Sequence, residues 1–282
     1  MLRDMTIPQQ STPTAEIGVI GGTGLYALVD DLVEVSVDTP YGPPSDSLFV
    51  GAMAGRQVAF LPRHGRAHRI NYRANLWALR SLGVRQVLGP CATGGLRPEH
   101  GPGTLLVPDQ FVDRTSGRVQ TFYDGEPRTD GAVPEVVHVS VADPYCPAGR
   151  ATALKAASTA GWEPVDGGTL VVIEGPRFST RAESRWYGAQ GWSVVGMTGH
   201  PEAVLARELG LCYTSIAVVT DLDAGVETGE GVTHTEVLRV FAGSIDRLRG
   251  VLQAAVAGLP ATAARDCVCS HALDGLETGL GF

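Results

Sequence analysis

The sequence lacks an excess of positive charge. It has 22 lysine and arginine residues against 30 aspartate and glutamate residues, and its net charge is −8. No basic cluster stands out, so binding to a nucleic-acid backbone is not expected. Long apolar runs are also missing, which argues against a membrane-spanning helix, and residues 1–16 have no apolar core of signal-peptide length. We expect a cytoplasmic protein with no nucleic-acid partner and no membrane partner.

Cysteine is scarce. The chain has five cysteines, and an odd number in a cytoplasmic chain of 282 residues does not indicate a disulfide framework. The stretch Cys267-Val268-Cys269-Ser270-His271 contains metal-ligand types, but a second ligand pair at zinc spacing is absent. We therefore predict no metal site and interpret residues 261–282 as a C-terminal tail.

Apolar runs alternate with helical patterns along the chain. Hydrophobic residues make up 44% of the sequence and charged residues 18%, enough apolar content for a sizeable core. Strands are predicted at 17–21, 57–61, 86–89, 104–107, 169–173, 193–195 and 213–220, and helices at 72–82, 149–160, 180–189, 201–209 and 235–257. The alternation predicts an α/β fold of one domain, residues 16–260, with a central mixed, mostly parallel sheet flanked by helices and a disordered tail at 1–15.

Polar, glycine-rich clusters follow four of these strands. Gly21-Gly22-Thr23-Gly24 could bring backbone N–H groups to an anion, although a tight turn explains it equally well. Residues 62–68 contain two arginines and two histidines, which favours a phosphate or carboxylate site over a solvated basic loop. Residues 90–95 and 195–202 are two further glycine-containing clusters that follow a strand and could bind an anion. In the second, the Thr198 hydroxyl could donate a hydrogen bond to it.

The strand at 169–173 ends in Glu174-Gly175-Pro176-Arg177-Phe178-Ser179. One interpretation is a connecting loop closed by a capping box of Thr180 and Glu183. The other is a ligand loop, because open α/β sheets bind ligands in the crevice at their strand ends.

The strand at 213–220 is followed by Asp221 and Asp223. Strand alternation would place both carboxylates on one side. Two like charges that close raise the pKa of at least one, which suits a proton donor. A capping pair or an exposed acidic loop is the alternative, and partners for a metal pair are missing nearby.

Taken together, these clusters resemble one family. Gly21-Gly22-Thr23-Gly24, Arg63-His64-Gly65-Arg66, residues 174–179, Met197-Thr198 with Pro201-Glu202, and Thr220-Asp221-Leu222-Asp223 occur in one order over residues 16–259. The set resembles the trimeric purine nucleoside phosphorylase superfamily, and within it the S-methyl-5′-thioadenosine phosphorylases. The resemblance implies cleavage of a purine N-glycosidic bond by inorganic phosphate, a co-substrate, with no cofactor.

The resemblance also implies roles for individual residues. The phosphate-binding residues would be Thr23, Arg63, His64, Cys91, Ala92 and Thr198. The substrate-binding residues would be Phe178, Ser179, Met197, Asp221, Asp223, His234, Val237 and His138. Asp221 and Asp223 would be catalytic, Asp221 at purine N7 and Asp223 at the exocyclic amine. The Asp pair would favour 6-aminopurines, since 6-oxopurine enzymes of the superfamily use Asn.

Departures from the family pattern concern the phosphate loop and the 5′ pocket. Cys91 replaces a threonine, and the segment 68–71 is shorter than in relatives. His234 stands where methylthioadenosine enzymes often have an aliphatic residue and nucleoside phosphorylases have a histidine for the 5′-hydroxyl. If His234 faces the pocket and not solvent, polar or small 5′ groups become admissible. His138 would come from a neighbouring subunit, which implies a homotrimer or hexamer.

We therefore expect a phosphorylase for 5′-methylthioadenosine or a related 5′-modified adenosine, giving adenine and a 5-modified ribose 1-phosphate. A phosphorylase for other purine nucleosides is the main alternative: adenosine, 5′-deoxyadenosine, 5′-haloadenosine or 6-oxopurine nucleosides. A hydrolytic nucleosidase would not need Arg63 and Thr198 as an anion clamp. A non-catalytic nucleoside-binding homologue would bind ligand without turnover.

Overall fold

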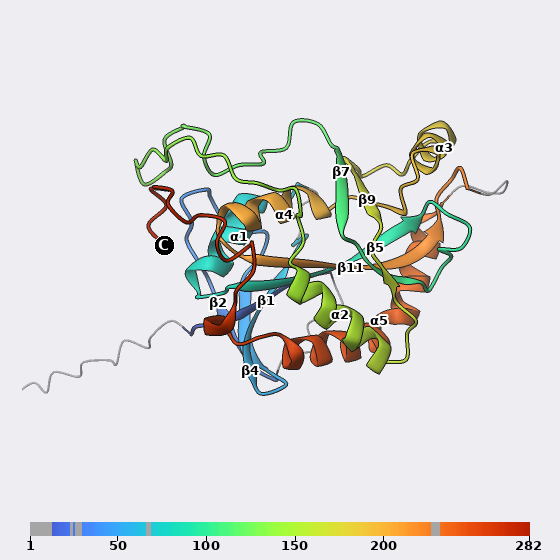
Figure 1. Cartoon of the computed structure of the whole chain (residues 1–282), viewed down its shortest axis with the longest axis horizontal. Coiled ribbons are helices and arrows are strands. Elements are labelled where there is room, and N and C mark those ends of the chain that lie inside the picture. The colour runs from blue at the N-terminus through green and yellow to red at the C-terminus, as the bar shows by residue number, and fades with distance from the viewer. Residues whose placement is uncertain (1–12, 23–24, 26–29, 66–68, 227–231) are drawn as a thin grey trace, which may run out of the picture.

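The computed structural model describes residues 13–22, 25, 30–65, 69–226 and 232–282. Within these ranges a mixed sheet is flanked by helices (Figure 1). Its strands are β1 (Ile17–Gly21), β2 (Asp30–Val35), β3 (Leu48–Met53), β4 (Arg56–Pro62), β5 (Gln86–Gly95), β6 (Leu105–Val107), β7 (Gln110–Arg114), β8 (Val165–Asp166), β9 (Thr169–Ile173), β10 (Val194–Gly196) and β11 (Cys212–Leu222). The helices are α1 (Tyr72–Ser81), α2 (Pro147–Thr159), α3 (Arg181–Ala189), α4 (Gly199–Glu208) and α5 (His234–Gly258). The predicted α/β fold with a central mixed sheet is confirmed.

The sheet is parallel around its centre. Its order is β2-β3-β4-β1-β5-β10-β9-β7, and β11 branches from β5 to carry β6 and β8. Strand β1 pairs in parallel with β4 and β5, and β11 pairs in parallel with β5. The β2–β3–β4 edge is antiparallel. Because the central strands are covered on both faces, they are apolar throughout, as the buried Ile-Gly-Val-Ile-Gly of β1 shows.

Two helix pairs cover the two faces. Helices α1 and α4 pack together on one face, and α2 and α5 pack together on the other (Figure 1). Leu79 and Leu205 belong to the first core cluster, and Leu252 belongs to the second. Val87 of β5 enters the first cluster and its neighbour Leu88 the second, as strand alternation requires.

Strand β5 changes neighbours along one of its edges. Strand β1 pairs with residues 86–88, and β10 pairs with residues 94 and 95 on the same side. Strand β11 follows the opposite edge of β5 over its whole length. In the described part of the chain no strand is paired with residues 89–93 on the first edge, and residues 90–93 line a cavity there.

Most of the helices and strands predicted from the sequence begin and end within two residues of the bounds in the structure. The strands at 17–21 and 169–173 and the cap of α3 agree with the prediction. The predicted end of the strand at Gly89 was wrong, because β5 continues to Gly95 and β11 pairs with all of it. Strands β2, β3, β7 and β8 were not predicted.

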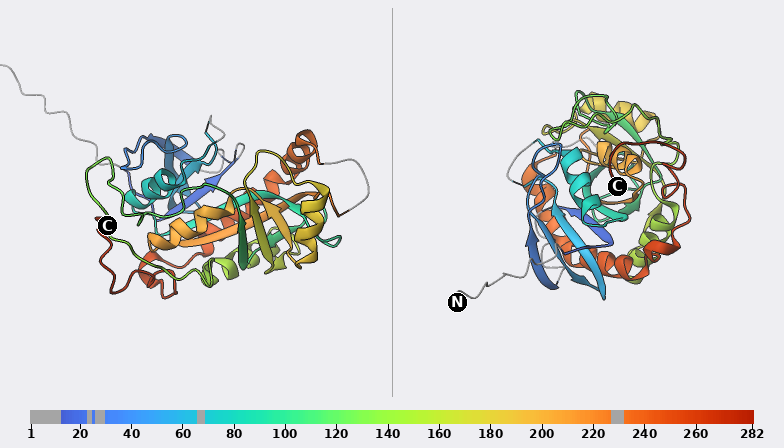
Figure 2. Two further views of the ribbon diagram at one scale, coloured as in Figure 1. Left: turned by 90° about the horizontal axis from the view of Figure 1, so that it is seen from above. Right: turned by 90° about the vertical axis from the view of Figure 1, so that its left-hand side faces the viewer.

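Residues 261–282 lie against the body of the protein. Leu280 is buried, and the ring of Phe282 lies 4.3 Å from that of Trp77 in α1. Figure 2 shows the C-terminus at the same side as this helix. At the other end, residues 1–12 of the predicted tail lie outside the described residues, and Ala15 is buried with its N–H bonded to the carbonyl of Leu82. No described helix has the length and apolarity needed to cross a membrane.

Candidate active site

A cavity of about 1190 Å³ opens where β1, β4, β5, β9, β10 and β11 end and α5 begins. It brings together twelve of the fourteen residues proposed from sequence: Arg63, His64, Cys91, Ala92, Phe178, Ser179, Met197, Thr198, Asp221, Asp223, His234 and Val237. Thr23 lies outside the described residues. His138 is exposed and is not part of the cavity wall.

Arg63 is held rigidly at the bottom of the cavity. Its Nε and Nη2 donate to the two carboxylate oxygens of Glu202 at 2.6 and 3.1 Å, and its Nη1 donates to the Pro90 carbonyl at 2.8 Å. Arg63 and Glu202 are both buried. Burial opposes the charge, but the Glu202 carboxylate outweighs it and holds the pKa of Arg63 above its ordinary value. Arg63 therefore remains a cation in a low-dielectric pocket.

The Arg63–Glu202 pair has a third partner. The Tyr213 hydroxyl donates to Glu202 Oε2 at 2.6 Å. A Cβ on Gly89 of β5 would collide with this hydroxyl, so glycine is required at that position. Bidentate pairing with Glu202 uses the Nε–H and one Nη2–H of the guanidinium, and the Pro90 carbonyl accepts from Nη1. One N–H on Nη1 and one on Nη2 therefore remain for an anion.

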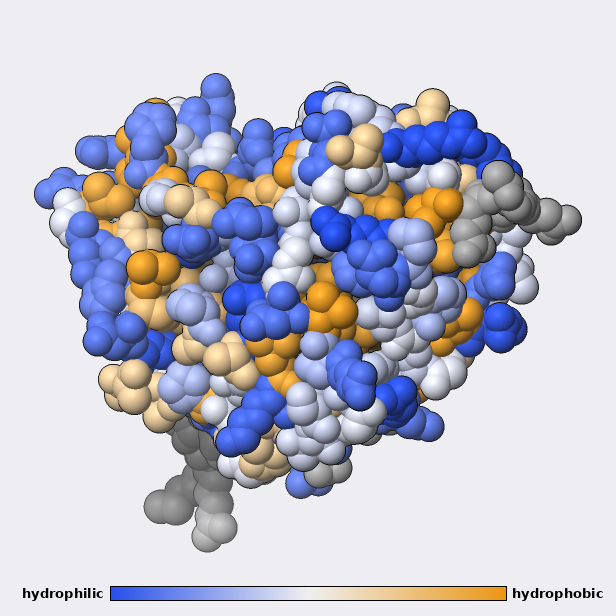
Figure 3. Space-filling model, turned by 45° about the vertical axis from the view of Figure 1, so that its right-hand side comes forward, coloured by the Kyte–Doolittle hydropathy of each residue, from blue (hydrophilic) through white to orange (hydrophobic). Residues whose placement is uncertain are grey.

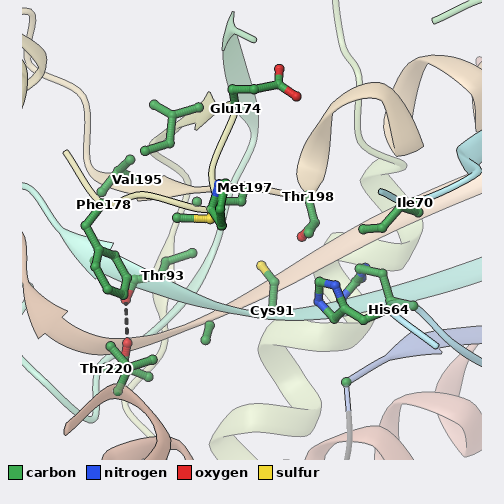
Figure 4. A pocket seen from close by; sticks show the side chains of 18 of the residues that line it. His64, Ile70, Cys91, Thr93, Glu174, Phe178, Val195, Met197, Thr198 and Thr220 are labelled. Atoms are coloured by element: carbon green, nitrogen blue, oxygen red, sulfur yellow. Dashed lines mark hydrogen bonds between the residues drawn. The ribbon is translucent and has the colours of Figure 1, made fainter. Parts of the chain in front are cut away.

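Three other side chains proposed for phosphate lie near one another on this side of the cavity. Figure 4 shows His64, Cys91 and Thr198 facing the same space. Thr198 is the N-cap of α4, but its side chain makes no capping hydrogen bond. Its hydroxyl therefore stays available at the start of a helix, where backbone N–H groups favour an anion.

Met197 separates the two halves of the cavity. In Figure 4 it lies between the Thr198 side and the Phe178 side. A Cβ on Gly175, which has φ +68°, would meet the Met197 sulfur at 2.6 Å. The absence of a side chain at Gly175 thus allows this loop to press directly on the thioether.

Arg118 also holds this region, and no motif in the sequence pointed to it. Its Nη1 donates to the Met197 and His200 carbonyls at 2.8 and 2.6 Å, and its Nη2 donates to the Glu174 carbonyl at 2.9 Å. Arg118 therefore ties the end of β9 to the β10–α4 loop and forms part of the cavity wall. Glu202 was quoted in the sequence pattern, but its pairing with Arg63 was not predicted.

Asp221 and Asp223 meet beside Gly94. The pairing of β11 with β5 shifts register between Val219 and Asp221, a bulge that turns the strand end. A Cβ on Gly94 would lie 3.1 Å from Asp221 Oδ1 and 3.4 Å from Asp223 Cβ. Both residues therefore lie beside one glycine on the cavity wall, on the common side that strand alternation predicted.

The environments of the two carboxylates differ. Burial raises the pKa of Asp221 to about 6, against a lowering hydrogen bond from Thr220 Oγ1 at 2.8 Å, and the nearby Asp223 charge raises it further. Asp223 is buried, and its Oδ2 has no hydrogen-bond partner. Ser179 Oγ, also on the cavity wall, is buried without a partner too. Buried polar atoms of this kind are expected to meet a ligand.

The loop after β9 is both a cap and a cavity wall. Thr180 accepts from the Glu183 N–H at 3.2 Å, and the Glu183 carboxylate accepts from the Thr180 N–H at 2.8 Å. Arg177 adds two bonds to that carboxylate, both 2.7 Å, which together with the Thr180 N–H lower the pKa of Glu183 to about 2. Phe178 and Ser179 of the same loop line the cavity. The capping box is therefore confirmed, and the ligand loop stays a prediction.

The start of α5 closes the cavity on one side. Thr233 caps the helix by accepting from the Glu236 N–H at 3.3 Å. The Glu236 carboxylate lies 3.7 Å from Arg239 Nη2 one turn further along the helix. His234 and Val237 line the cavity, and His234 is at the same time exposed to solvent.

Comparisons with known proteins agree with this architecture. The chain matches the sequence model of the Phosphorylase superfamily over residues 16–257. It is 74% identical over 273 residues to a purine nucleoside phosphorylase of Streptomyces coelicolor, covering 95% of this chain and 98% of that protein. It is 56% identical over 231 residues to an S-methyl-5′-thioadenosine phosphorylase of Mycolicibacterium smegmatis, covering 80% and 84%.

A solved structure of methylthioadenosine phosphorylase from Schistosoma mansoni in complex with adenine is also similar. Its TM-score is 0.81 at 37% sequence identity, with 90% of this chain and 93% of that chain covered. The fold of this chain is thus shared with that structure. The protein belongs to the Phosphorylase superfamily, which confirms the resemblance noted in the sequence.

Proposed function

We propose that this protein cleaves the N-glycosidic bond of 5′-methylthioadenosine, or of a related 5′-modified adenosine, with inorganic phosphate. The products are adenine and a 5-modified ribose 1-phosphate. The observation that carries the proposal is the pair at Gly94: Asp221, with a pKa of about 6, and Asp223, with a buried, unpaired oxygen. The names of the relatives and the adenine-bound structure support it.

The carboxylate pair matches the needs of an aminopurine leaving group. As the C1′–N9 bond breaks, negative charge develops on the purine, and a proton from Asp221 to N7 neutralises it. The unpaired Asp223 Oδ2 accepts from the exocyclic amine at C6. Phe178 and Ser179 border the base in the same half of the cavity.

The other half of the cavity supplies the nucleophile. Arg63, His64, Thr198 and the backbone near Cys91 and Ala92 hold a phosphate dianion, whose oxygen forms the new bond to C1′. That dianion also stabilises the positive charge that develops on the sugar. Met197 lies between the two sites, where the ribose must be. Phosphate is consumed as a co-substrate, and the reaction requires no cofactor.

His234 carries a second candidate function. A ring nitrogen on the cavity wall can bond a 5′-hydroxyl, whereas a methylthio group offers it only a weak acceptor. The relative with 74% identity is named a purine nucleoside phosphorylase. Phosphorolysis of adenosine or another purine nucleoside with a polar or small 5′ group is therefore the alternative.

We also propose that the enzyme is a homotrimer, with a hexamer as the larger alternative, and that His138 completes the 5′ pocket of a neighbouring subunit. His138 is exposed and lies outside the cavity of its own chain. Just before it in the chain, Val133 and Val136 are each more than half exposed. Figure 3 shows apolar side chains on the drawn face in several small, separate groups.

The substrate proposal is tested by the rate of base release at saturating phosphate. The substrates are 5′-methylthioadenosine, 5′-deoxyadenosine, adenosine and inosine, each with the native protein and with His234→Val. We expect kcat/KM for methylthioadenosine to exceed that for inosine by at least about 10-fold, from the charged hydrogen bond at Asp223. Adenosine ahead of methylthioadenosine, with the order reversed by His234→Val, would establish the second candidate. Inosine ahead of every aminopurine would refute both assignments of the Asp pair.

A further inference from the structure

Four cysteines that the reaction does not use converge at the end of the sheet opposite the cavity. Cys146 occupies the N-cap position of α2, Cys212 begins β11, and Cys267 and Cys269 lie in the C-terminal segment. Their four sulfur atoms all lie within 4.8 Å of one another. None of the four lines the cavity, where the fifth cysteine, Cys91, is found. The ligand pair that seemed missing from the sequence is supplied from distant parts of the chain.

We propose that Cys146, Cys212, Cys267 and Cys269 form a structural metal site that binds one divalent zinc ion through four thiolates. Soft thiolate donors in tetrahedral array are the preferred ligand set of structural zinc. A zinc–sulfur bond of about 2.3 Å gives tetrahedral sulfur–sulfur edges of about 3.8 Å. The distances of 3.3 Å between Cys212 and Cys267 and 3.9 Å between Cys146 and Cys267 bracket that value.

The geometry fits a shared ion better than a particular disulfide. The Cys267 sulfur is close to two different partners, Cys146 and Cys212, at distances well beyond a bond of about 2.0 Å. Three of the four side chains are buried, and Cys267 is half-buried. A closed set of four protein ligands leaves no open position for substrate, so the role is structural.

Two arginines complete the charge balance. Arg207 Nη2 lies 3.6 Å from Cys269 Sγ and Arg265 Nη1 lies 3.4 Å from Cys212 Sγ, each as a donor. Four thiolates around a divalent ion carry two negative charges, which these two guanidinium groups offset. Among the described ion pairs none joins either arginine to a carboxylate, although Arg207 is buried. Both arginines donate to backbone carbonyls, Arg207 to Ser140 and Asp143 and Arg265 to Arg85 and Gly210. An anionic tetrathiolate site would supply the counter-charge that these neutral acceptors do not.

Each ligand is set in backbone that is already held in place. The Cys146 N–H bonds to the Tyr213 carbonyl at 2.8 Å, and the Cys212 N–H bonds to the Arg85 carbonyl at 3.0 Å. The Cys267 turn is closed by the N–H and hydroxyl of Ser270, which both donate to the Cys267 carbonyl. His271, the other ligand type in this stretch, instead contacts Asp266 and Asp274. The ion would fasten residues 261–282 to the start of β11 and α2.

The test is the metal content of the full chain, purified under reducing conditions from cells supplied with zinc and without a metal-affinity step. Elemental analysis should find one zinc per chain in the native protein and in Cys91→Ser, and less than about a tenth in Cys267→Ser/Cys269→Ser. The double variant should melt at least about 5 °C lower. Cobalt substituted into the native protein should give the visible absorption of a tetrahedral thiolate complex.

Two measurements on the native protein would overturn the proposal even if the cysteine variants fail to fold. Native protein that contains no metal and shows five reactive thiols after denaturation would mean an unoccupied cysteine cluster. An intact mass below that of the fully reduced chain by the two hydrogens lost per disulfide would mean that the cysteine cluster is oxidised to one or two disulfides. Arg265→Met offers a milder probe, since loss of a donor to a metal ligand should weaken zinc affinity about 10–100-fold; an unchanged affinity would remove the arginine from the site.

Discussion

Strand β11 carries reactive side chains at both ends, and the two ends differ in how their polar groups are satisfied. At its start, the Cys212 sulfur has three other sulfurs within 4.8 Å and an arginine donor at 3.4 Å. At its far end, the Asp223 carboxylate has a buried oxygen with no partner. A buried, closed set of four ligand side chains outside the cavity indicates a structural site, whereas a polar atom left unpaired on a cavity wall indicates contact with a substrate.

Removal of the acid at the cavity end should have the largest effect. Asp221→Asn is expected to lower kcat by about 10²–10⁴, because the purine would leave without a proton donor. In the native protein kcat/KM should fall as pH rises above about 6, where Asp221 loses its proton, and the variant should lack that limb. Steady-state kinetics from pH 5 to 9 would measure both, with the exposed Asp246→Asn as a control. An unchanged kcat would contradict the assigned role.

Breaking the buried ion pair beneath the phosphate half is the next largest change. Glu202→Gln leaves Arg63 buried without its counter-charge, which is expected to cost about 3–5 kcal/mol of unfolding free energy. Urea unfolding measures that cost, and the phosphate KM should rise because Arg63 is no longer fixed. The exposed Glu163→Gln is the control. Equal stability of the two variants would mean that the pair does not hold Arg63 in place.

The third prediction separates the two carboxylates. Asp223→Asn should lower the ratio of kcat/KM for aminopurine over oxopurine nucleosides by about 10–100-fold, because an amide can donate to a 6-oxo group where a carboxylate can only accept. Asp221→Asn should reduce both substrates together. Competition assays with adenosine and inosine would show the difference. If this ratio falls in Asp221→Asn and not in Asp223→Asn, the roles assigned to the two carboxylates must be exchanged.

The smallest expected effect is on stability. The pKa of Asp221 is higher in the fold than its ordinary value, so the folded state binds the proton more tightly and loses stability as pH rises from about 4 to about 6. Asp221→Asn should therefore be more stable than the native protein by about 1–3 kcal/mol at pH 8, with the difference vanishing near pH 4. Thermal melts at both pH values would measure this. A variant less stable than the native protein at pH 8 would show that burial does not disfavour the ionised Asp221 carboxylate.

The sequence predicted features that depend on neighbouring residues. The Thr180 cap, the strand ends and the common side of Asp221 and Asp223 follow from local pattern. The Arg63–Glu202 pair joins residues 139 positions apart, and Cys146 and Cys267 are 121 positions apart. Contacts at that separation depend on sheet order, which local periodicity does not encode. The extension of β5 through residues 90–95 was hidden because its proline and glycines resemble a loop.

The central claim is that phosphate held at the cavity end of β11 attacks the sugar as adenine leaves. It is tested most directly by incubating the protein with 5′-methylthioadenosine with and without phosphate, measuring adenine by absorbance and the sugar product by phosphorus NMR. We predict adenine release only with phosphate, together with one equivalent of a sugar 1-phosphate. Equal release without phosphate would indicate hydrolysis, and tight binding of methylthioadenosine with no release would indicate a binding protein; either result would contradict the claim.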